Sequence, residues 1–152
     1  MLFGADRDAL RLAWARAWRR RREGLPLEAL DAALADVVDL HPEYQPLLEK
    51  LSPGAAGEGS DDLGRTWLPE DGESNPFLHM GMHMAIREQV STDRPAGIRR
   101  VHEQLTKAAG DRHVAEHRMM EALGEALWQA QRSGTAPDEQ AYLEALIALS
   151  GR

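Results

Sequence analysis

Histidine is the residue type in this chain that is best suited to chemistry, because the 152 residues include six histidines and no cysteine. Four of them form two pairs with a spacing of four residues, His79 with His83 and His113 with His117. In an α-helix this spacing places both imidazoles on one face, a turn apart, where their ring nitrogens can chelate a metal ion. Without cysteine, a disulfide scaffold, a thiolate zinc finger, a cysteine-ligated iron–sulfur cluster and a cysteine nucleophile are excluded.

Both pairs fall on the apolar face of the helix expected to carry them. At about 100° per residue, Ile86 and Val90 continue the stripe of the first pair. Met120 and Leu127 continue the stripe of the second pair, and Glu121 lies at the edge of that stripe. An imidazole on a buried face needs a partner for its nitrogens, which a metal ion or a hydrogen-bonding group can supply.

The order of the helices predicts that the two pairs meet. Helices are expected at about 76–90, 94–109 and 112–132, and the short connections between them imply an up, down, up arrangement with the first and third parallel. Each pair begins in the first turn of its helix, so both would lie at one level. His41 ends a helix expected at 26–41 and would reach that level if this helix is antiparallel to the next. The sequence thus predicts a metal site formed by His41, His79, His83, His113, His117 and Glu121.

The nature of the metal and the role of the site are left open by the residues. Imidazole and carboxylate without thiolate suit divalent zinc, iron or nickel, and copper or manganese are compatible as well. An open coordination position would allow hydrolytic or oxidative chemistry, so a metalloenzyme is one form of the prediction. Glu116, in His113-x-x-Glu116-His117, would then act beside a metal-bound water, and Glu88 could also support a ligand. The alternative is a non-catalytic interaction or structural protein whose histidines form a buried polar network.

Apolar residues recur with helical spacing nearly everywhere, and no sustained alternation typical of strands is present. This pattern predicts an all-α fold and a single domain over 1–152, a bundle of about six helices with an up-and-down core. Further helices are expected at about 6–22 and 137–150, with a short turn of helix at 44–51. A Gly-rich and acidic stretch at about 52–75 is expected to form a long loop.

Charge and hydropathy indicate the class of partner. The chain carries 18 basic and 25 acidic residues, for a net charge of −7, so nucleic acid is not expected despite the arginines at 19–22. Trp14 and Trp18, which share a helix face with Leu10, are expected in the core. No apolar stretch approaches the ~18 residues of a membrane span, and no signal peptide is recognised, so a cytoplasmic protein is expected. A homodimer through the tryptophans or the helix at 137–150 is compatible with the sequence.

Several stretches of the chain are similar to a bacterial family. They include the residues from Asn75-Pro76-Phe77-Leu78-His79 to Gln89, and Asp93-Arg94-Pro95-Ala96-Gly97-Ile98. The others are Glu116-His117-Arg118-Met119-Met120-Glu121, the run 124–132, and Phe3-Gly4 with Asp6-Arg7. In these residues the chain resembles the proteobacterial domain of unknown function 1841, over nearly its whole length except 52–65. The resemblance implies a small cytoplasmic bacterial protein and assigns no activity.

Overall fold

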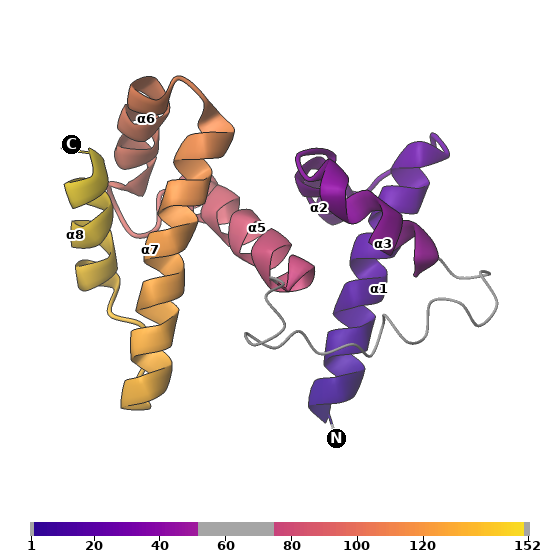
Figure 1. The fold of residues 1–152 in the computed structure, drawn as a ribbon, viewed down its shortest axis with the longest axis horizontal. Helices are drawn as coiled ribbons and strands as arrows, with labels where there is room; N and C mark the ends of the chain where they lie inside the picture. Colours follow the sequence, from indigo (N-terminus) through magenta and orange to yellow (C-terminus); the bar gives the residue numbers. More distant parts are fainter. Residues whose placement is uncertain (1, 52–74, 151–152) are drawn as a thin grey trace. The chain divides into compact units, whose positions relative to one another are not determined.

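The computed structural model describes residues 2–51 and 75–150, which form seven α-helices and one short 3-10 helix (Figure 1). No strand occurs among these residues, so the predicted all-α fold is confirmed. The loop expected at 52–75 lies, except for residue 75, outside the described residues. Contacts between Cα atoms divide the chain into two compact units, Met1–Met80 and Gly81–Arg152, and each is described by itself. The assignment of 1–152 to a single domain stays a prediction.

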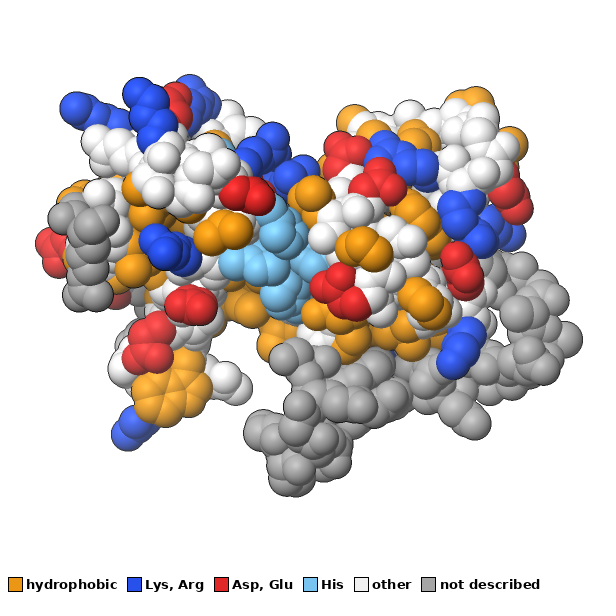
Figure 2. All heavy atoms as spheres, turned by 45° about the horizontal axis from the view of Figure 1, so that its top comes forward, with side chains coloured by type: hydrophobic (Ala, Val, Ile, Leu, Met, Phe, Trp, Pro, Cys, Tyr) orange, Lys and Arg blue, Asp and Glu red, His pale blue; other side chains and the backbone are white. Residues whose placement is uncertain are grey.

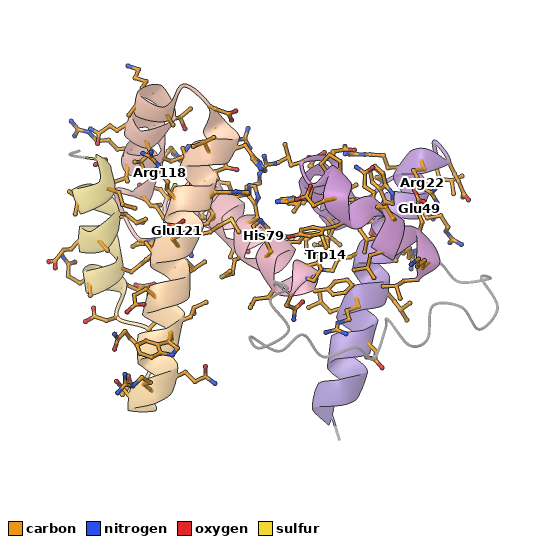
Figure 3. The ribbon with its side chains drawn as sticks, in the orientation of Figure 1. Trp14, Arg22, Glu49, His79, Arg118 and Glu121 are labelled. Carbon is orange, nitrogen blue, oxygen red and sulfur yellow. The ribbon has the colours of Figure 1, made fainter. Side chains whose placement is uncertain are left out.

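In the first unit, α1 packs against α2 and α3. The elements are α1 (Leu2–Arg22), α2 (Ala29–Asp39), the 3-10 helix η1 (Pro42–Tyr44) and α3 (Gln45–Lys50). Trp14 and Trp18 are buried, as their shared helix face predicts, and Figure 3 shows Trp14 on α1. The buried aliphatic side chains that accompany them are Leu34, Val37, Val38, Leu48 and Leu51.

The helix expected at 26–41 is shorter than predicted, because its ends are used for other contacts. The carbonyl oxygen of Pro26 accepts hydrogen bonds from the Arg20 side chain at 3.0 and 2.7 Å, and α2 begins only at Ala29. At the other end, Pro42 follows His41 and stops the helix, which ends at Asp39. His41 therefore precedes η1 and is not part of α2.

The basic end of α1 is neutralised by acidic residues of the same unit. The guanidinium of Arg21 contacts Asp36 at 2.7 Å and Asp39 at 2.6 Å. The hydrogen bond with Asp36 is the main reason that the pKa of Arg21 is raised. Arg22 pairs with Glu49 on α3 at 3.2 Å (Figure 3). Arg21 and Arg22 therefore belong to a charge-paired surface.

In the second unit, α6 and α8 both pack against α7 and against each other. The elements are α5 (Pro76–Thr92), which begins in the first unit, α6 (Ile98–Ala109), α7 (Arg112–Ser133) and α8 (Glu139–Ser150). In Figure 1 α7 runs in the direction opposite to α6 and α8. The core of this unit is made of apolar side chains that include Ile86, Ile98, Val101, Leu105, Met119, Met120, Leu123, Tyr142 and Leu146.

Two features of the second unit differ from expectation. In Figure 1 α5 runs obliquely to α7, so the prediction that these two helices are parallel is wrong. The helix expected from Arg94 begins at Ile98. The Asp93 carboxylate accepts hydrogen bonds from the backbone amides of Gly97 and Arg99 at 3.1 and 3.0 Å, and Gly97 has φ +101°, so the preceding residues form a turn.

The surface carries charges of both signs. On the face shown in Figure 2, Lys and Arg side chains lie interspersed with Asp and Glu side chains. Among the described residues, every helix is too short or too polar to cross a membrane.

The start of α5 provides a test of the local structure that positions its histidines. The Asn75 side-chain oxygen accepts hydrogen bonds from the backbone amides of Phe77 and Leu78 at 3.0 and 3.3 Å, as an N-cap does. We expect Asn75→Ala to lower the free energy of unfolding by about 1 kcal/mol, measured by urea denaturation. Asn75→Asp keeps an acceptor at this position and is the control. An equal loss in both variants would contradict the capping role.

Candidate metal centre

Three imidazoles converge in the second unit. His83 comes from α5, and His113 and His117 come from the first two turns of α7. The ring centres of His113 and His117 are 4.1 Å apart, and the centre of His83 lies 5.3 and 5.4 Å from them. A ring nitrogen of His83 and one of His117 lie within 4.8 Å of each other. The spacing of four residues thus places His113 and His117 side by side, as predicted.

The position of these rings follows from the start of α7. The Asp111 side chain accepts a hydrogen bond from the backbone amide of His113 at 2.7 Å, so α7 begins at Arg112. His113 and His117 are half-buried, whereas His83 is fully buried. Because His113 and His117 are only half-buried, an ion in solution has access to their rings.

Glu116 is the carboxylate that the structure places beside these histidines. Its side chain is 1% exposed, and its Oε1 accepts hydrogen bonds from His83 Nε2 at 2.6 Å and Arg87 Nε at 3.3 Å. Its Oε2 accepts hydrogen bonds from His102 Nε2 at 2.8 Å and Arg112 Nε at 2.9 Å. One buried carboxylate therefore receives four donors, from α5, α6 and α7.

These donors keep Glu116 ionised. Burial alone would raise the pKa of Glu116. The hydrogen bonds from the two imidazoles and Arg112, with the charge of Arg87, outweigh burial and hold this pKa well below its usual range. Because an ionised carboxylate only accepts, His83 must donate through Nε2–H, which leaves Nδ1 as the atom that can ligate a metal. A carboxylate that orients a ligand imidazole in this way is a common feature of metal sites.

A second pair of imidazoles lies in the first unit. His41 and His79 have their Nε2 atoms 3.1 Å apart, and Figure 3 shows His79 on α5. His41 Nδ1 lies 2.7 Å from the carbonyl oxygen of Val37, and donation to this oxygen leaves His41 Nε2 with its lone pair. The ring of Tyr44 stacks on His41 at 5.5 Å and lies against His79 at 5.8 Å.

The distance within this pair is compatible with a shared ion. A tetrahedral zinc ion with Zn–N bonds of about 2.0–2.1 Å holds its nitrogens about 3.3–3.4 Å apart. The 3.1 Å between the two Nε2 atoms of His41 and His79 is close to this value. The same contact is a hydrogen bond between the two rings, which a metal ion would replace.

The predicted site histidines belong to two groups, one in each unit of the chain. His41 lies with His79 in the first unit, and His83 lies with His113 and His117 in the second. Glu121 is exposed on α7 (Figure 3), and its role as a ligand stays a prediction. Glu88, the other carboxylate considered, is also exposed.

Sequence reasoning missed three residues that contact Glu116. His102 is the one histidine that the predicted metal site does not include. In the structure it lies on α6 and donates a hydrogen bond to Glu116. Arg112 precedes Glu116 by four residues, a spacing that could have indicated the contact. Arg87 follows His83 by four residues on α5, and this spacing could likewise have indicated that the two side chains lie on one face of the helix.

Comparison with known proteins identifies a family but no activity. The model of a family described as a domain of unknown function (DUF1841) matches residues 6–148, which is nearly the whole chain. No curated protein and no solved structure matches the chain. The chain belongs to the family of the domain of unknown function DUF1841.

Proposed function

We propose that this protein binds a divalent transition metal ion through the imidazoles of His83, His113 and His117. The observation that carries the proposal is the convergence of three rings from two helices, with centres no more than 5.4 Å apart. The buried Glu116 supports the proposal, because its carboxylate accepts the hydrogen bond from His83 Nε2 and so fixes the ring. The other ring nitrogen, Nδ1, is the one that would ligate the ion.

The donor set favours zinc, with iron or nickel as alternatives. Imidazole is a good ligand for all three metals, and the chain offers no thiolate that would favour a softer ion. Three protein ligands leave one position of a tetrahedral ion for water or substrate, and zinc lowers the pKa of a bound water to about 7. A hydrolytic metalloenzyme is therefore the catalytic form of this proposal.

We also propose that His41 and His79 contribute to metal binding. Their Nε2 atoms are spaced nearly as in a zinc site, and His79 lies one helical turn before His83 in the continuous helix α5. The number of ions bound per chain separates two arrangements. One ion that requires histidines of both groups indicates a shared site, and two independent ions indicate a site in each unit.

A non-catalytic role is the alternative, and one observation favours it. His83 and His102 already form hydrogen bonds with the buried Glu116, so part of the cluster is satisfied without a metal. In this alternative the histidines form a structural polar network, and another surface of the protein binds a partner. As the family resemblance implies, we place the protein in the bacterial cytoplasm in either case.

Titration with zinc separates the two functions. We expect His83→Ala and His117→Ala each to raise the Kd for zinc by more than about 100-fold, beyond the usual effect of losing an outer partner of a ligand. His102→Ala is the matched control, because it removes a histidine that donates a hydrogen bond to Glu116 and is not one of the proposed ligands, and we expect a change of about tenfold or less. Isothermal titration calorimetry of the full chain, with the fold of each variant checked by circular dichroism, gives these values.

Two outcomes of this titration would contradict the metal-binding proposal. The first is a wild-type protein that does not take up zinc, iron or nickel. The second is a set of variants in which His83→Ala and His117→Ala bind zinc as tightly as His102→Ala does. Either result would favour the structural network.

A further inference from the structure

Two arginines flank the imidazoles of the second unit. Arg87 lies one turn after His83 on α5, and Arg112 immediately precedes His113 on α7. Both guanidiniums contact the same carboxylate through Nε, at 3.3 Å for Arg87 and 2.9 Å for Arg112. Their side chains are 24% and 56% exposed, so both remain accessible to a ligand from solvent.

The two arginines carry more positive charge than the single carboxylate of Glu116 can neutralise. One arginine would balance the single negative charge of this carboxylate, and two leave an excess of +1, in a protein whose net charge is −7. A divalent ion on the histidines would raise the local excess to +3. Such a site favours an anionic ligand, because charge interactions are strong where water is partly excluded.

The guanidiniums also retain the groups that recognise an oxyanion. The contacts with Glu116 use only Nε of each arginine, so the two Nη amino groups are not needed for that carboxylate. Arginine Nη groups donate to phosphate and carboxylate oxygens in paired, charge-assisted hydrogen bonds. Both arginines thus keep donors for an anion while they contact the carboxylate that holds His83.

We infer that the metal site takes an oxyanion, and that Arg87 and Arg112 hold the phosphate or carboxylate group of its substrate beside the ion. This inference rests on the proposed metal binding and names the class of ligand for the same site. The competing explanation is that both arginines serve only to stabilise the buried Glu116. In that case no anion binds in an arginine-dependent manner.

Binding of simple oxyanions to the zinc-loaded protein tests the inference. The probes are methylphosphonate and acetate, with acetamide as the uncharged control for acetate. We expect Arg87→Gln and Arg112→Gln each to weaken binding of the better anion by about tenfold or more, the loss typical of a charge-assisted hydrogen bond. The matched control is Arg118→Gln, an exposed arginine on α7 (Figure 3), which should leave anion affinity unchanged.

The outcomes separate this inference from the proposed function. If zinc binds as expected but the three arginine variants bind methylphosphonate and acetate as wild type does, the inference is wrong and metal binding stands. If the anions bind equally well after zinc has been removed, the metal-linked part of the inference is overturned. If acetamide binds as tightly as acetate, charge is not what the site recognises, which also overturns it. If zinc itself does not bind, it is the proposed function that fails.

Discussion

Replacement of Glu116 by alanine is expected to lower the free energy of unfolding by about 1–3 kcal/mol, the cost of leaving the buried donor of His83 without its partner. Glu116 is 1% exposed and receives hydrogen bonds from two imidazoles and two arginines. Its loss would leave the buried His83 without an acceptor for Nε2–H and Arg87 without its counter-charge.

Urea denaturation of the metal-free protein measures this effect. Glu121→Ala is the matched control, because Glu121 is an exposed glutamate on the same helix, and we expect a change within about 0.5 kcal/mol. Equal stability of the Glu116 and Glu121 variants would show that the hydrogen-bond network around Glu116 does not hold α5, α6 and α7 together.

The lowered pKa of Glu116 also predicts how its contribution to the free energy of unfolding changes with pH. Because the folded protein lowers the pKa of Glu116, this group contributes stability at all pH values above its unfolded pKa of about 4.3. The contribution is lost as the pH falls below that value, because the carboxylate of the unfolded chain takes up a proton while that of the folded protein stays ionised. In metal-free protein, the difference in stability between wild type and Glu116→Ala should therefore shrink as the pH falls below about 4.3. A difference that grows in acid would contradict the pKa shift.

Zinc is expected to stabilise the wild-type protein against unfolding by about 4 kcal/mol when its free concentration is 1,000 times the Kd. The stabilisation arises because the ion binds the folded arrangement of His83, His113 and His117 better than it binds the unfolded chain. We expect His83→Ala and His117→Ala to remove the part of this shift that comes from the ion bound by these three histidines. Thermal or urea denaturation with and without zinc measures it.

Magnesium is the control ion for this stabilisation. It prefers oxygen ligands in octahedral geometry, so a site built from imidazoles should not respond to it. Equal stabilisation by zinc and magnesium would indicate a nonspecific effect on acidic side chains. Equal stabilisation of wild type and His117→Ala by zinc would place the ion elsewhere in the protein.

Much of the fold could be predicted because its signals are local. Helical spacing of apolar residues, the cap at Asn75 and the glycine at Gly110 are each read from a few neighbouring residues, and the helices from α5 to α8 are found where these signals place them, apart from the start of α6. The late starts of α2 and α6 depend on contacts that spacing does not reveal. Arg20 uses the carbonyl oxygen of Pro26, and Asp93 holds the turn before α6.

The candidate site was predicted only in part, for a related reason. The pairing of His113 with His117 follows from helix geometry, and its proximity to His83 was also expected. The contact of His102 with Glu116 joins two helices and depends on how they pack, which periodicity does not define. Glu121 lies at the edge of the apolar stripe and is exposed, whereas Glu116 points into the cluster that the histidines form.

The metal content of the protein tests the central proposal most directly. The full chain, produced without a histidine tag and dialysed after exposure to zinc, iron or nickel, is analysed for the number of ions per chain. We expect about one tightly bound ion per chain if the two groups of histidines share a site, or about two if they act separately. Less than about 0.2 ions per chain for all three metals would contradict metal binding by these histidines.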